Sequence, residues 1–350
     1  MSDAPPRDAP PRDALPRPAR PGLWRRLRRR RGSLAALTVL LLFVLLAIGA
    51  PLLPLAHPAE TNTARASQGP SPSWTERSAE VEREAADAHP WASAVRTQLF
   101  GAHALQGALG SDALGRDLAA RIVWGARVSL AVALAATLVS VLLGVAYGVL
   151  AGFVGGRVDQ VMMRAIDVLY SIPFLFLVIL VVSVLRDERV AAAVQSWGLD
   201  QLSLLFLVIG AVSWLGMARL VRGQLLSLRE AEFVTAARAL GVTPLRLAWR
   251  HLLPHLGGII VVVLTLTVPR VMLFEAFLSF LGLGVEPPGV SWGLLASDGL
   301  AALTPVSRSW WLVVFPGLAL AASLFSLNLL GDALRDALDP RTGRNGKPAG

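Results

Sequence analysis

TAARALGVTPLRLAWRHLLP, residues 235–254, interrupts a series of apolar runs with a basic, amphipathic segment. Residues 230–240 favour a helix, and Gly241 suits a left-handed stop. Thr243 and Pro244 suit the N-cap and the first turn of a second helix. One face of that second helix would be apolar and another basic. The apolar face would hold Leu245, Ala248, Trp249 and Leu252, and the basic face Arg246 and Arg250. The segment predicts two short helices joined at a glycine.

The composition around this segment is that of a membrane protein. Of the 350 residues, 54% are hydrophobic and 16% are charged, and the mean hydropathy is +0.56, well above that of an ordinary soluble domain. The chain has no cysteine, which excludes disulfides and thiolate metal sites. The net charge of +9 comes from arginine, because Lys347 is the only lysine.

Basic residues gather directly before the first apolar run, where cytoplasmic anchoring explains them without nucleic acid. These are Arg25, Arg26, Arg28, Arg29, Arg30 and Arg31. Residues 24–56 are therefore expected to form the first transmembrane helix with its cytoplasmic arginine cluster. Its apolar run, 34–55, is long enough to cross a core of ~30 Å. A cleaved signal peptide is the alternative, and the length of the run favours an uncleaved anchor.

The rest of the chain divides by composition. Residues 1–23 repeat a Pro-Arg-Asp-Ala theme and are expected to be a disordered basic tail. Residues 57–108 are acidic and predict an extracytoplasmic loop or small cap. Residues 109–334 are expected to hold five further transmembrane helices and the loop 230–254, and residues 335–350 a cytoplasmic tail. The apolar runs of this core lie near 128–153, 160–184, 202–224, 256–284 and 309–332.

These runs predict an all-α polytopic membrane protein with six transmembrane helices and both termini inside. With that orientation the loop 230–254 faces the cytoplasm. Pro254 would end the second short helix of the loop before the fifth span begins.

Small and charged residues inside the spans have two interpretations each. Gly144 and Gly148 either let two helices approach closely or line a translocation path, and packing is the simpler account. Arg270 and Glu275 in the fifth span each cost at least ~2.5 kcal/mol at mid-bilayer unless paired or wetted. Both would face a wet translocation path, or Arg270 would snorkel or pair with another subunit.

Three functions fit the loop 230–254. It could lie on the bilayer as an interfacial helix, bind DNA as a helix-turn-helix, or dock a cytoplasmic partner. DNA binding is disfavoured because a membrane span lies within a few residues of each end of the loop. The amphipathic pattern leaves the other two open.

The loop resembles the conserved cytoplasmic EAA loop of binding-protein-dependent ABC importer permeases. That pattern is Glu-Ala-Ala, three residues, Gly, nine residues, and then a hydrophobic residue, any residue, Leu and Pro. Thr235 and His251 depart from it, at the glutamate and at the hydrophobic position. The matching residues are Ala236, Ala237, Gly241, Leu253 and Pro254.

Four further stretches resemble signature stretches of the C-type permease subunit of dipeptide and oligopeptide ABC importers, and the resemblance covers residues 24–341. They are LGSDALGRDLAARIVWGARVSL (109–130), GGRVDQVMMRAIDVLYSIP (155–173), LFEAFLSFLGLGVEPPGVSWG (273–293) and LGDALRDALDPR (330–341). The resemblance implies a MetI-like permease bundle in a bacterial inner membrane.

The resemblance also implies a transport subunit that forms half of the translocation path of an ATP-driven peptide importer. Its implied partners are a second permease subunit, two cytoplasmic ATPase subunits and an extracytoplasmic solute-binding protein, besides the lipid bilayer. The sequence has no Gly-Lys-Ser or Gly-Lys-Thr phosphate loop, so the partner subunits would use the ATP, and we expect no catalytic residue, bound cofactor or metal in this chain. The expected ATPase-coupling residues are Ala236, Ala237, Gly241, Val242, Leu245, Arg246, Trp249 and Pro254.

A secondary transporter or channel that works without an ATPase is the alternative. The scarcity of acidic residues within the spans disfavours it. A membrane-embedded enzyme is disfavoured because the five histidines show no metal-ligand spacing.

Overall fold

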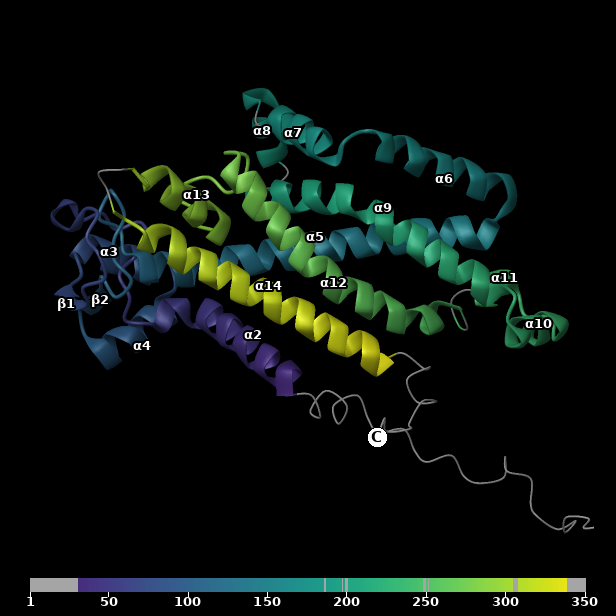
Figure 1. Cartoon of the computed structure of the whole chain (residues 1–350), viewed down its shortest axis with the longest axis horizontal. Coiled ribbons are helices and arrows are strands. Elements are labelled where there is room, and N and C mark those ends of the chain that lie inside the picture. Colours follow the sequence, from purple (N-terminus) through teal and green to yellow (C-terminus); the bar gives the residue numbers. More distant parts are fainter. Residues whose placement is uncertain are drawn as a thin grey trace, which may run out of the picture.

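The computed structural model describes residues 31–185, 187–196, 198, 201–247, 250, 252–304 and 308–338. It is an elongated helical bundle with a small folded unit at one end and two short helices at the other (Figure 1). Within the described ranges, five helices are long and apolar enough to cross a membrane, and one bent pair would make a sixth span. The five are α2 (Arg31–Gly49), α5 (Leu118–Val154), α9 (Gln201–Arg229), α12 (Leu253–Phe280) and α14 (Trp311–Leu338).

Helix α5 is longer than the apolar run that predicted it. It begins at Leu118 instead of near 128, because the Asp117 carboxylate caps it by accepting a hydrogen bond from the Ala120 amide at 2.7 Å. It ends where Gly155 adopts a φ of +69°. The helix therefore crosses the membrane region and continues into the folded unit beyond it.

Glycines allow α5 and α9 to pack closely. A Cβ atom on Gly144 would lie 2.5 Å from Met217 Cβ, and one on Gly148 would lie 2.6 Å from the Ala218 carbonyl oxygen. Real side chains do not approach this closely, so the contact requires glycine at both positions. Both glycines thus lie in a helix interface, and the alternative that they line a path does not fit their position.

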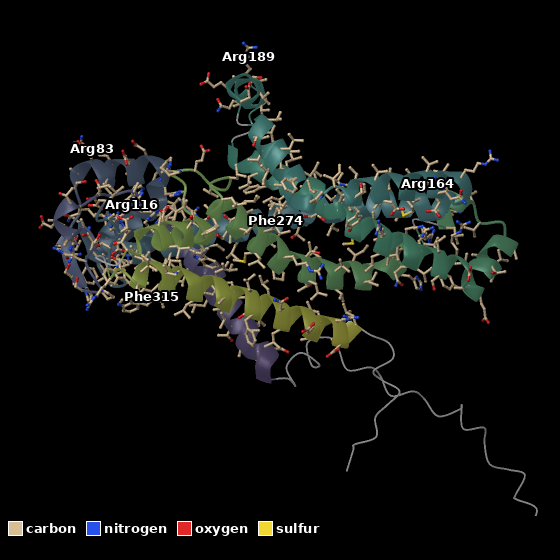
Figure 2. The ribbon with its side chains drawn as sticks, turned by 45° about the horizontal axis from the view of Figure 1, so that its top comes forward. Arg83, Arg116, Arg164, Arg189, Phe274 and Phe315 are labelled. Carbon is tan, nitrogen blue, oxygen red and sulfur yellow. The ribbon has the colours of Figure 1, made fainter. Side chains whose placement is uncertain are left out.

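The run predicted at 160–184 is not one straight helix. It forms α6 (Gly156–Ser171) and α7 (Phe174–Leu185), which meet at an angle of 85°. Pro173 explains the break, because proline has no backbone N–H and disfavours helix in the residue before it. The short helix α8 (Glu188–Gln195) follows and protrudes from the bundle, as the position of Arg189 in Figure 2 shows.

Residues 57–108 fold into a compact unit, which we call the cap. It contains an antiparallel pair of strands, β1 (Ser73–Glu76) and β2 (His103–Gln106), with Ser73 opposite Gln106. Two helices, α3 (Ala79–Ala88) and α4 (Pro90–Phe100), pack beside the strands, and the nearly inaccessible Arg96 lies 3.5 Å from Glu82 between them. The cap lies at the end of the bundle opposite the loop 230–254 (Figure 1). Its extracytoplasmic location stays a prediction.

The stretch 109–130 docks the cap onto the bundle. The Asp112 carboxylate accepts hydrogen bonds from Arg116 Nε at 2.6 Å and Arg121 Nη1 at 2.7 Å. Arg121 also reaches Asp298 of α13 (Trp292–Ala302) at 3.3 Å. The Trp311 indole N–H donates to the Ser111 carbonyl oxygen at 3.2 Å. These contacts join the stretch to α5, α13 and α14, and backbone hydrogen bonds from Ser67 to Asp112 and from Ser111 to Gln68 join it to the cap.

Candidate functional site: a terminal loop and a membrane cavity

The loop between α9 and α12 is fixed to the bundle along its inner face. It contains α10 (Glu232–Ala239) and α11 (Pro244–Leu247). The Val234 and Leu247 side chains are 0% and 1% exposed, and they belong to one apolar cluster with Leu225 of α9 and Leu256 of α12. A buried core residue resists displacement from its neighbours. The loop is therefore fixed to the ends of two membrane-spanning helices.

The turn between the two short helices has the predicted geometry. Gly241 has a φ of +77°, the left-handed region that glycine adopts without strain. The Val242 amide donates to the Ala237 carbonyl oxygen at 3.1 Å, the six-to-one bond that closes a helix before a left-handed glycine. Val242 and Ala237 also pack against the apolar cluster under the loop. The turn thus holds α10 and α11 at a defined angle.

The outer face of the loop is open. Leu240 is 84% exposed, and Phe233, Ala236 and Arg246 are exposed as well. A Cβ atom on Gly241 would meet nothing within 4 Å. An exposed large apolar side chain at the tip of a loop is typical of a surface that a partner covers.

The predicted coupling residues divide between the two faces. Ala236, Gly241 and Arg246 lie on the outer face, as does Thr235, whereas Ala237 and Val242 are half-buried beneath it. The side chain of Leu245 and the whole of Trp249 lie outside the described residues. Leu240 was missed by the sequence interpretation. Its separation of about 120° from the buried Val234 around the helix, at 100° per residue, is the signal that places it on the open face.

The second short helix differs from its prediction. Helix α11 spans Pro244–Leu247, and it buries Leu247, which the predicted apolar face did not include. Pro254 does not end this helix but lies in the first turn of α12. A proline is tolerated there because the amides of a first turn have no partner within the helix.

A cavity of about 440 Å³ lies on the side of the bundle, where the break between α6 and α7 faces α9 and α12. Its polar lining residues are Tyr170, Ser213, Thr267 and Arg270. Phe274, which also lines it, lies near the middle of the bundle in Figure 2. Among the described residues around this cavity, Arg270 is the only one with a formal charge.

Glu275 does not line this cavity, and of the two alternatives for this residue, a translocation path or helix packing, its position fits helix packing. Its side chain is 0% exposed and accepts a hydrogen bond from Ser279 Oγ at 2.8 Å. The hydroxyls of Ser129 and Ser291 lie against the same carboxyl group. Glu275 thus lies where α12 packs against α5 and the start of α13, and among the described residues no basic side chain forms an ion pair with it.

A helical membrane bundle with an anchored helix–glycine–helix loop at one end, and a largely apolar cavity that holds one arginine on its side, fits a transport permease. The chain belongs to the family of binding-protein-dependent transport system inner membrane components, whose family model matches residues 144–344. The model of the N-terminal TM domain of oligopeptide transport permease C matches residues 22–70. The chain is therefore a multi-pass inner-membrane protein, and the predicted all-α polytopic fold is confirmed.

Three curated relatives illustrate the similarity. The oligopeptide transport system permease protein OppC of Escherichia coli K12 is 49% identical over 232 residues, which are 66% of this chain and 72% of the relative. The OppC protein of Haemophilus influenzae is 45% identical, over 66% of this chain and 70% of the relative. The dipeptide transport system permease protein DppC of Bacillus subtilis is 39% identical, over 67% of this chain and 69% of the relative.

Proposed function

We propose that this chain is one of two permease subunits in an ATP-driven importer of dipeptides or oligopeptides. The second permease subunit completes the translocation path, two cytoplasmic ATPase subunits hydrolyse the ATP, and an extracytoplasmic binding protein delivers the peptide. The relatives described above are oligopeptide and dipeptide transport permeases, which supports the substrate class. In this proposal the core 109–334 spans the membrane, the cap 57–108 faces outward, and the loop 230–254 faces the cytoplasm.

The two-sided loop is the observation that carries the proposal. Its outer face presents Leu240 and Arg246 for a partner, and its inner face buries Val234 and Leu247 against α9 and α12. A partner that moves the outer face must move the ends of both helices, because the buried side chains join them. Closure of the ATPase pair would thereby change which side of the membrane the path opens to.

The alternative, a transporter without an ATPase, fits the structure less well. Proton-coupled transport uses intramembrane carboxylates, and the described lining of the cavity contains none. Such a transporter also has no use for an apolar tip on the loop.

The proposal is tested with the whole complex reconstituted in liposomes. We expect Leu240→Asp to insert normally but to lose co-isolation of the ATPase subunits and ATP-dependent peptide uptake, because a charge cannot enter an apolar groove without a partner. The matched control is Leu99→Asp, since Leu99 is also exposed, at 67% against 84% for Leu240, but lies on α4 in the cap. Peptide uptake by the wild type without ATP, or retention of the ATPase by Leu240→Asp, would overturn the proposal.

A further inference from the structure

Arg270 lies deep in a membrane-spanning helix. It is 16 residues after Pro254 and 10 residues before Phe280, the two ends of the apolar span in α12. At 1.5 Å per residue these separations are roughly 24 Å and roughly 15 Å. Both distances exceed the reach of an arginine side chain, so its guanidinium does not extend along the helix to either end of the apolar span.

Arg270 has no hydrogen-bond or ion-pair partner among the residues that the structure describes. Glu275, the nearest acid along the helix, is bonded to Ser279 and fully buried elsewhere. An unpaired cation in the bilayer core costs at least about 2.5 kcal/mol, which is why such residues mark substrate or ion pathways. The exposed guanidinium therefore calls for an anion from outside the chain.

The cavity around Arg270 has a chemistry suited to one end of a peptide. Ser213 Oγ donates to the Ile209 carbonyl oxygen at 2.6 Å, and Thr267 Oγ1 donates to the Val263 carbonyl oxygen at 2.7 Å. Each hydroxyl proton is thus committed to its own helix, and each oxygen remains able to accept a hydrogen bond. The lining combines one cation with two acceptors, and no carboxylate of the described lining is available for an ammonium group.

We propose that Arg270 binds the C-terminal carboxylate of the transported peptide, while Ser213 and Thr267 accept hydrogen bonds from its N–H groups. This inference rests on the proposed function. A planar guanidinium pairs with a carboxylate through two parallel hydrogen bonds, and the low dielectric of the membrane strengthens that pair. The cavity volume of about 440 Å³ lies within the range of roughly 300–1,000 Å³ typical of sites for small ligands.

The test compares one peptide as its free acid and as its C-terminal amide, both at saturating concentration, in the reconstituted whole complex. For each peptide, uptake by the Arg270→Met complex is divided by uptake by the wild-type complex. Any preference of the binding protein for one of the two peptides affects both complexes equally and therefore cancels from this ratio. We expect the free-acid ratio to fall roughly tenfold or more, the value of a hydrogen bond to a charged group, while the amide ratio stays near one. Arg270→Lys keeps the charge and should retain more free-acid uptake than Arg270→Met.

Arg164→Met is the matched control, because Arg164 lies on α6 outside the cavity and away from Phe274 (Figure 2). It should leave both ratios near one. Equal ratios for the two peptides in Arg270→Met would overturn the assignment. Loss of the second permease subunit on purification of Arg270→Met would also overturn it, since that result assigns Arg270 to a subunit contact. A wild-type complex that takes up neither peptide would instead contradict the proposed function itself.

Discussion

Arg222 of α9 holds Asp159 of α6 with two hydrogen bonds. Its Nε and Nη2 atoms lie 2.7 and 2.5 Å from the two carboxylate oxygens. A second pair, Arg219 and Asp167 at 2.6 Å, joins the same two helices further along α6. The two pairs attach α6 to α9 before the 85° bend, so the ion pairs, and not apolar packing alone, fix the broken segment to the bundle.

The first pair should contribute more stability than the second. Asp159→Asn should lower the free energy of unfolding by about 1.5–3 kcal/mol, because it weakens hydrogen bonds to a charged group. The Asp159 side chain is only 10% exposed, whereas that of Asp167 is 64% exposed. The control Asp167→Asn should therefore cost only about 0–1 kcal/mol. Thermal unfolding of the purified protein in detergent measures both, and equal losses would contradict the difference assigned here.

The glycines of the α5–α9 interface should not tolerate a methyl group. Gly148→Ala would place Cβ 2.6 Å from the Ala218 carbonyl oxygen, so we expect a loss of stability of about 1–3 kcal/mol from overpacking. Gly223→Ala is the control on α9, because a Cβ atom there meets nothing within 4 Å. The control should be neutral or slightly stabilising. The amount of folded protein recovered from the membrane, together with its melting temperature, checks the prediction.

Gly241→Trp should separate ATP hydrolysis from transport. Position 241 has open space and a positive φ in the isolated chain, and in our proposal a partner backbone approaches it closely. We expect normal insertion, with ATP turnover by the complex no longer accompanied by uptake. Gly156→Trp is the control, since Gly156 also has a positive φ and open space but lies at the start of α6. Normal uptake by Gly241→Trp would be incompatible with a close contact at this glycine.

The cap should loosen in acid because of His57. Burial lowers the pKa of His57 from 6.5; Arg77 lowers it further, whereas Glu84 and Glu60 oppose the shift. The folded state thus binds a proton less readily than the unfolded state. The stability that neutral His57 contributes is fully present above pH 6.5, the ordinary pKa of histidine. It is lost as the pH falls through the lowered pKa of the folded state.

Hydrogen exchange of the cap residues across this pH range checks the prediction. Relative to the intrinsic exchange rate at each pH, His57→Gln should lose less protection in acid than the wild type does. His103→Gln, at an exposed position on β2, should behave as the wild type does. An identical pH response in His57→Gln would assign the loosening to other groups.

Local chemistry made part of this structure predictable from sequence. Gly241 was recognisable because a left-handed stop between two helix formers favours glycine, and its φ of +77° agrees. The apolar runs predicted the positions of most spanning helices, because an apolar run long enough to cross the bilayer is rarely stable outside a membrane. The class of the protein followed from motifs at fixed spacing.

Features that depend on distant partners were not predictable. The start of α5 depends on the hydrogen bond that the Asp117 side chain accepts from the first turn, and the burial of Glu275 depends on the packing of α12 against α5 and the start of α13. The pairing of Asp159 with Arg222 joins residues 63 positions apart. Pro173 is visible in the sequence, but the size of the bend it permits is set by the ion pairs and packing of α6 and α7.

The most direct test of the account uses the absence of cysteine from the chain. Leu240→Cys places a single thiol on the exposed tip of the loop, and Leu99→Cys places one on the cap. We expect assembly with the ATPase subunits to protect the thiol at position 240 from a maleimide. A short crosslinker should join this thiol to an ATPase subunit. The thiol at position 99 should react with the maleimide equally fast before and after addition of the ATPase subunits. Equal labelling of position 240 in the isolated chain and in the transport-competent complex would contradict the central claim that this loop is the ATPase contact.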